Sequence, residues 1–151
     1  MPKSFLFVVN LSELKIACSK MIPSFPNRLP QSPIYKKAQE IFTLSRHIST
    51  YLTDDLAVLQ EDGNEDPSIY FGGDIVQQSV SLAPEILKAE SETYAEEKHK
   101  HAASVTRLVN RIHKNCERLE HANSNGKDFL PILRGEIKKF RKLQRSWMLT
   151  F

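Results

Sequence analysis

Two rows of cationic side chains in the last third of the chain have the residue types and the spacing for contacts with a phosphate backbone. Within each row most neighbours are three or four residues apart, so a helix would place a row on one face. Lysine and arginine in such a row can pair with phosphates in a salt-sensitive way that depends little on base sequence. The nine candidate nucleic-acid-binding residues are Arg107, Arg111, Lys114, Arg118, Arg134, Lys138, Arg141, Lys142 and Arg145.

The charge distribution supports this interpretation but leaves an alternative open. Residues 1–94 hold 8 Lys and Arg against 12 Asp and Glu, whereas residues 95–151 hold 13 against 6, a net charge of +7. Helical bundles commonly have solvated charged faces, and Glu117, Glu120 and Glu136 interrupt the positive field. A molecule with this asymmetry can present a basic face to nucleic acid, or it can pair its own halves across protomers.

Other residues with chemical potential do not form a recognisable site. Glu96 and His99 make a single Glu-x-x-His pair, whereas a ferritin-like di-metal site needs two such pairs and two more glutamates. Cys116 falls on an apolar stripe, with no partner arrangement for nucleophilic catalysis. Gly72-Gly73 lacks the preceding strand and the spacing of a phosphate loop. We therefore predict no catalytic residue, no metal, no cofactor and no enzymatic activity.

The basic rows are expected to lie on two helices that form a hairpin. Apolar residues step by 3-4-3-4-3 from Ala102 to Leu119 and again, with Gln144 in the series, from Leu130 to Trp147. Residues 124–126, Ser-Asn-Gly, provide the turn between them. This pattern predicts an antiparallel helical hairpin with Trp147 as a core or interface anchor.

Two more helices are predicted upstream. Ser32-Pro33 and Asp66-Pro67 each combine a capping residue with a proline at the first helical position. The second of these helices should bend at Pro84 and pack Gly72-Gly73 closely against a neighbour.

The later helix starts are less clearly marked. We place the turn between the second and third helices at residues 91–93, where Thr93 and Glu96 match a capping box. Asp128 is the expected cap of the fourth helix.

The predicted fold class is all-α: an antiparallel up-down-up-down four-helix bundle over residues 32–151, preceded by an extended, proline-rich arm over residues 1–31. Three prolines within residues 21–30 exclude regular structure there. Phe5–Val9 is either a short strand or sequence upstream of a true start at Met21, and we favour the second. This run is too short for a signal peptide or a membrane span, so we expect a cytoplasmic protein with reduced thiols and no membrane contact.

Three segments between Pro33 and Trp147 carry a resemblance to a known family. They are Ser-Pro-Ile-Tyr-Lys-Lys-Ala at 32–38, the proline-containing helix at 79–90, and Leu-Arg-Gly-Glu-Ile at 133–137 followed by Ser-Trp at 146–147. They resemble the four-helix-bundle proteins encoded within 23S rRNA intervening sequences and their relatives, the accessory variability proteins of diversity-generating retroelements. The residues after Pro84 lack the Asn and Gly that many members have, which suggests a divergent member.

The resemblance implies a bacterial cytoplasmic protein without catalytic activity. It also implies a ring-like homo-oligomer, a pentamer in the retroelement relatives, that binds DNA or RNA through a basic surface and has a protein partner such as a reverse transcriptase. The alternative is a protein-interaction module whose basic face docks an acidic partner protein.

Overall fold

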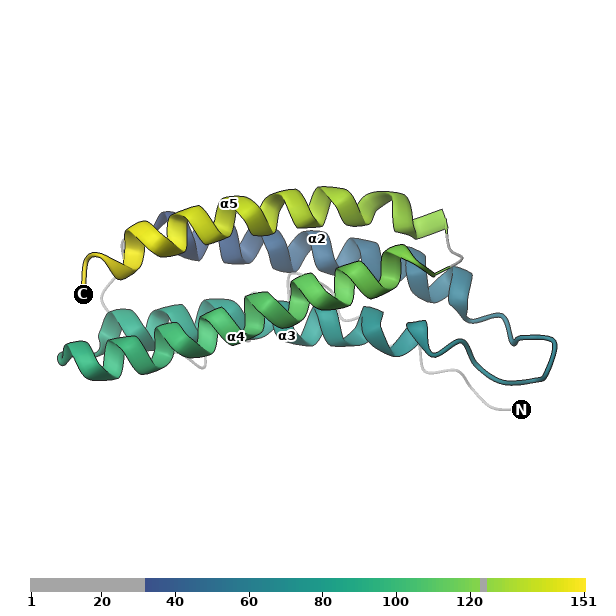
Figure 1. Cartoon of the computed structure of the whole chain (residues 1–151), viewed down its shortest axis with the longest axis horizontal. Coiled ribbons are helices and arrows are strands. Elements are labelled where there is room, and N and C mark those ends of the chain that lie inside the picture. Colours follow the sequence, from purple (N-terminus) through teal and green to yellow (C-terminus); the bar gives the residue numbers. More distant parts are fainter. Residues whose placement is uncertain (1–31, 123–124) are drawn as a thin grey trace, which may run out of the picture. The chain divides into compact units, whose positions relative to one another are not determined.

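The computed structural model describes residues 32–122 and 125–151, which form four α-helices, one short 3-10 helix and no strand (Figure 1). The α-helices are α2 (Pro33–Leu56), α3 (Ser68–Ser91), α4 (Ala95–Glu120) and α5 (Leu130–Met148), and the 3-10 helix η1 (Asn125–Phe129) leads into α5. The all-α prediction is confirmed for this part of the chain. The predicted arm over residues 1–31, with Met21 and Phe5–Val9, lies outside the described residues.

The four helices share one core. Helix α2 packs against α3 and α5, and α4 packs against the same two helices; Figure 1 shows the α2–α5 and α3–α4 pairs side by side. All the residues of the two predicted stripes are buried, from Ala102 to Leu119 on α4 and from Leu130 to Trp147 on α5. Burying one such aliphatic side chain stabilises the fold by about 1.5–3 kcal/mol, which explains why both charged rows remain outside.

Several buried polar groups in the core pair across helices. The Ser45 and Ser79 hydroxyl oxygens lie 2.9 Å apart between α2 and α3, and Ser79 also donates to the Ile75 carbonyl. Gln144 Nε2 of α5 donates to Thr106 Oγ1 of α4 at 2.7 Å. A buried polar group without a partner costs about 1–3 kcal/mol, so a shift of either helix pair by one turn would be penalised.

The first two helix starts largely follow the predicted pattern. Ser32 stands at the N-cap of α2 with Pro33 in the first position, although the Ser32 side chain makes no capping hydrogen bond. At the start of α3, Asp66 Oδ1 accepts the Ser68 N–H at 2.9 Å, but Pro67 holds the N-cap position and Ser68 is the first helical residue, so Pro67 lies one residue earlier than predicted. The turn between α3 and α4 falls at residues 92–94, within one residue of the prediction.

Two predicted caps are wrong. Tyr94, not Thr93, precedes α4, and no side chain caps this helix; Glu96 and Glu97 in its first turn instead complement the positive end of the helix dipole. Asp128 lies inside η1, and Phe129 holds the N-cap position of α5 with helical dihedral angles. Because the 3-10 helix runs directly into α5, the chain has no extended residue there for a side-chain cap.

Only one glycine of the predicted close-packing pair is buried. Gly72 faces α2, where an added Cβ would lie 3.7 Å from Ser49 Oγ, whereas Gly73 is exposed with no neighbour within 4 Å of such an atom. Pro84 lies inside the unbroken helix α3.

A third glycine, Gly126, makes a closer approach between η1 and α2. A Cβ on Gly126 would lie 3.1 Å from Leu52 Cδ2 and 3.3 Å from the Leu52 backbone nitrogen. The Gly126 N–H also donates to Asp55 Oδ2 at 3.2 Å.

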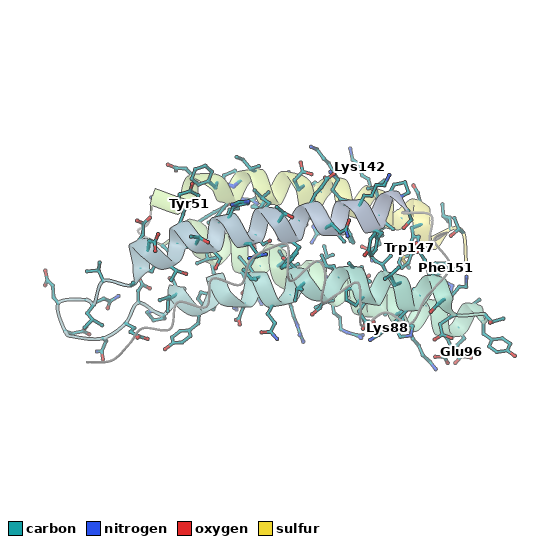
Figure 2. The ribbon with its side chains drawn as sticks, turned by 180° about the vertical axis from the view of Figure 1, so that it is seen from behind. Tyr51, Lys88, Glu96, Lys142, Trp147 and Phe151 are labelled. Carbon is teal, nitrogen blue, oxygen red and sulfur yellow. The ribbon has the colours of Figure 1, made fainter. Side chains whose placement is uncertain are left out.

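Trp147 is part of the core, as predicted. It is 8% exposed, its Nε1 donates to Glu90 Oε1 at 3.2 Å, and its ring meets Phe151 edge-to-face at 4.8 Å (Figure 2). We expect Trp147→Ala to lower the free energy of unfolding by about 3–5 kcal/mol in a urea titration followed by circular dichroism. Leu149→Ala, at a position that is 87% exposed, is the control and should change it by less than about 0.5 kcal/mol. Equal stability of the two variants would contradict this role for Trp147.

Candidate nucleic-acid interface

Each basic row lies on the solvent side of its helix because the apolar stripe occupies the opposite side. The four cations of α4 are exposed, as are Lys138, Lys142 and Arg145 of α5. Arg134 and Arg141 are half-buried. The nine predicted residues therefore remain accessible to different degrees.

The α5 row lines the boundary with α4. Arg134 Nη1 donates to both carboxylate oxygens of Glu120, at 2.9 and 2.7 Å. Arg141 Nη2 donates to Asn110 Oδ1 at 3.1 Å. Both contacts join α5 to α4 and identify the edge of α4 that faces α5.

The α4 row is turned partly toward α3. The Arg118 guanidinium lies 5.1 Å from the ring centroid of Phe71 on α3. Asn115 Nδ2, on the same side of α4, donates to Gln78 Oε1 of α3 at 3.1 Å. Arg118 therefore lies at the α3 edge of α4, away from the α5 row.

A polar strip separates the two rows. Asn110, His113, Glu117 and Glu120 follow one another at three- or four-residue intervals and share the α5-facing edge of α4. His113 Nδ1 and Glu117 Oε1 are 3.6 Å apart. The sequence predicts one basic face interrupted by glutamates. The three-residue spacing of Glu117 and Glu120, which continues the spacing of Asn110 and His113, is the signal in the sequence that these residues form a strip.

The cations differ in what they already contact. Arg134 has the ion pair with Glu120, and its hydrogen bonds to that carboxylate raise the pKa of Arg134. Arg107 Nη2 donates to Ser104 Oγ at 2.7 Å. Within residues 32–122 and 125–151, the side chains of five of the nine have no ion pair, hydrogen bond or aromatic contact, and so offer their charge to an outside anion. These five are Arg111, Lys114, Lys138, Lys142 and Arg145.

The described residues contain no group of three His, Cys, Asp or Glu side chains placed to hold a metal ion. A mainly apolar cavity of about 410 Å³ lies at the end of the bundle that holds Trp147 and Phe151, and Lys98 and Glu90 contribute its charged groups. Glu90 is engaged by Trp147 Nε1 there. The cavity lining includes no cysteine or histidine.

Comparisons with known protein families, with curated proteins and with solved structures found no match to this chain. In the described part of the chain, no helix combines the length and the apolar character that crossing a membrane requires.

Cys116 is fully buried in the core, and desolvation raises the pKa of its thiol to about 12. A thiol that stays protonated is a poor nucleophile. The sequence has one other cysteine, Cys18, which is replaced so that only Cys116 can react. In a Cys18→Ser background, we expect iodoacetamide to leave the folded protein unmodified at neutral pH and to alkylate Cys116 fully in denaturant, as measured by mass spectrometry. Rapid alkylation of the folded protein would show that this thiol is reactive.

Proposed function

We propose that this chain is a non-catalytic four-helix-bundle protein that binds nucleic-acid backbone through the two basic rows. The observation that carries the proposal is the set of five exposed cations whose side chains have no partner in the described residues, within residues 95–151, which have a net charge of +7. Phosphate binding by such side chains releases condensed counterions, which favours association at low salt.

The kind of nucleic-acid contact is inferred from what the rows lack. The exposed aromatic side chains Tyr51, Tyr70, Tyr94 and Phe129 all lie outside both rows. Stacking of unpaired bases needs such rings, so the rows are better suited to backbone phosphates than to bases. We propose binding with little sequence preference, to DNA or to RNA.

For the fold we propose an up-down-up-down order of the four helices. It is supported by the contacts between neighbouring helices: as residue numbers rise along one helix, the numbers of their contact partners on the next helix fall. Along α3 and α4, for example, Glu85 meets His101 and Gln78 meets Asn115. Along α4 and α5, Thr106 meets Gln144 and Glu120 meets Arg134.

The family resemblance extends the proposal to assembly and location. We propose a cytoplasmic homo-oligomer, with a pentameric ring as the form that the resemblance implies and a reverse transcriptase as the implied protein partner.

A triple charge reversal tests the proposed contact. Arg111→Glu, Lys138→Glu and Lys142→Glu together should abolish binding of labelled duplex DNA and structured RNA in fluorescence anisotropy, because they replace three cations with anions that repel phosphate. The fold should be retained, because these side chains have no internal partner to lose. For the wild type, the logarithm of the binding constant should fall with the logarithm of salt concentration by about 0.9 per phosphate contact on duplex DNA.

The matched control makes the same charge change elsewhere, with Lys36→Glu, Arg46→Glu and Lys88→Glu on α2 and α3. It should keep most of the binding. Equal binding by both triple variants, or no binding by the wild type at about 50 mM salt, would reject the nucleic-acid proposal. The rows would then be better explained as a docking surface for an acidic partner protein.

A second test removes a negative charge from the polar strip, which should strengthen nucleic-acid binding. Glu117 is exposed and lies between the rows, so Glu117→Gln should strengthen nucleic-acid binding by roughly two- to fivefold, the range expected for one exposed charge. Glu61→Gln removes the same charge from the α2–α3 loop and should have a smaller effect. Weaker binding by Glu117→Gln would mean that the strip is not next to the bound phosphates.

A further inference from the structure

Large apolar side chains are exposed mainly at one end of the bundle. Of the nine that are exposed among the described residues, six lie where the end of α2, the α2–α3 loop, the start of α3 and the start of α5 meet. We call these six the apolar end: Tyr51, Val58, Leu59, Tyr70, Phe129 and Ile132. Figure 2 shows Tyr51 at the end of the bundle opposite Trp147 and Phe151.

The centre of the apolar end is an aromatic pair. Tyr51 of α2 and Phe129 of η1 are stacked, with ring centroids 5.4 Å apart, yet Tyr51 is 55% exposed. Ile132 lies one helical turn beyond Phe129 and is 54% exposed. Exposed apolar side chains gathered in this way commonly mark an interaction surface.

The same region is acidic, which restricts what can cover it. Residues 48–84, which hold four of the six side chains, contain seven Asp and Glu and no Lys or Arg, and residues 125–132, which hold the other two, add one Lys and one Asp. Three of these carboxylates, on Asp54, Glu61 and Asp74, are exposed and have no hydrogen bond or ion pair within the described residues. Aromatic rings and carboxylates both attract cations, so the surface fits a partner rich in Arg and Lys.

The chain itself shows that its aromatic rings attract cations. The Arg118 guanidinium lies over Phe71 at 5.1 Å, Arg46 over Phe42 at 5.6 Å, and Lys98 Nζ over Phe151 at 5.9 Å. Arginine or lysine from another molecule could occupy the exposed face of the Tyr51–Phe129 pair in the same way.

A second copy of this chain carries the complementary surface. Its two basic rows contain five cations whose side chains have no partner in the described residues. They lie within residues 95–151, which have a net charge of +7. Two apolar ends placed face to face would instead bring carboxylates against carboxylates, which is unfavourable. We propose that the apolar end of one copy docks on the basic rows of another.

This contact joins two different surfaces, so it can be repeated from copy to copy. Such head-to-tail contacts close into rings when the rotation between copies allows it, and otherwise form open chains. The contact also uses the surface assigned above to nucleic acid. In that one respect the inference rests on the proposed function: nucleic acid and a second copy compete for the basic rows, and salt weakens both contacts.

Reciprocal charge reversal tests the contact. The end variant carries Asp54→Lys, Glu61→Lys and Asp74→Lys; the face variant carries Arg111→Glu, Lys138→Glu and Lys142→Glu. In sedimentation velocity at about 50 mM salt, the wild type should self-associate, and each variant alone should associate at least tenfold more weakly. An equimolar mixture of the two variants should associate again, because every surface then meets one of opposite charge.

Three results would overturn the proposal: a wild type that is monomeric, an end variant that self-associates as the wild type does, or a mixture that stays dissociated although both variants retain wild-type helicity. A monomeric wild type would leave the apolar end to another occupant, such as residues 1–31 or a different protein. A contact driven by apolar burial alone would persist at high salt, which also counts against the proposal.

Nucleic-acid binding is measured separately on the same proteins. The end variant keeps the basic rows and should still bind labelled duplex, whereas the face variant should not. If the mixture restores association but the end variant, whose basic rows stay free, binds no nucleic acid, the contact stands and the proposed function fails. If the face variant loses nucleic-acid binding but keeps the mass of the wild-type assembly, the proposed function stands and the contact between copies fails.

Discussion

The structure depends on the burial of four apolar stripes against one another, and the charged surface is a consequence of that burial. On α4 and α5 the stripes use every third or fourth position, and Asn115 is the one buried residue of these two helices outside them. Most of the remaining positions face water, where Lys and Arg can remain charged at little cost. A helix rotated about its axis would bury guanidinium or ammonium groups, so the packing of the core also fixes the direction in which the cations point.

Polar pairs within the core add specificity that apolar contacts lack. The Ser45–Ser79 and Asn115–Gln78 contacts each join two helices at one register, because amide and hydroxyl groups need a partner at hydrogen-bond distance whereas methyl groups do not. The contacts on the surface are different in kind. Lys37, for example, bonds Glu136 across the α2–α5 boundary, and the hydrogen bond to Glu136 is the largest cause of its raised pKa, yet such partly exposed pairs contribute little to stability.

Periodicity predicted the helices well because it records which positions are buried. It placed Val105, Cys116, Leu133 and Trp147 in the core correctly. Capping patterns did less well: the one at Thr93 located the turn before α4 within one residue, but neither Thr93 nor Asp128 is the cap that the backbone uses. The relation between the two basic rows was also beyond the sequence, because the angle between neighbouring helices determines which edge of each row faces the other. That is why Arg118 lies toward α3 while Arg134 lies against α4.

Gly126 has a consequence that reaches beyond its turn. Its lack of a side chain lets η1 lie directly on the Leu52 backbone of α2, and this contact sets where the polypeptide turns from α4 into α5. The separation between the helices that bear the two basic rows is thus governed in part by an uncharged residue distant from most of the cations. Among homologous sequences, position 126 should therefore tolerate fewer replacements than any individual lysine of the rows. A surface charge can be supplied from a neighbouring position, whereas only glycine leaves room for Leu52.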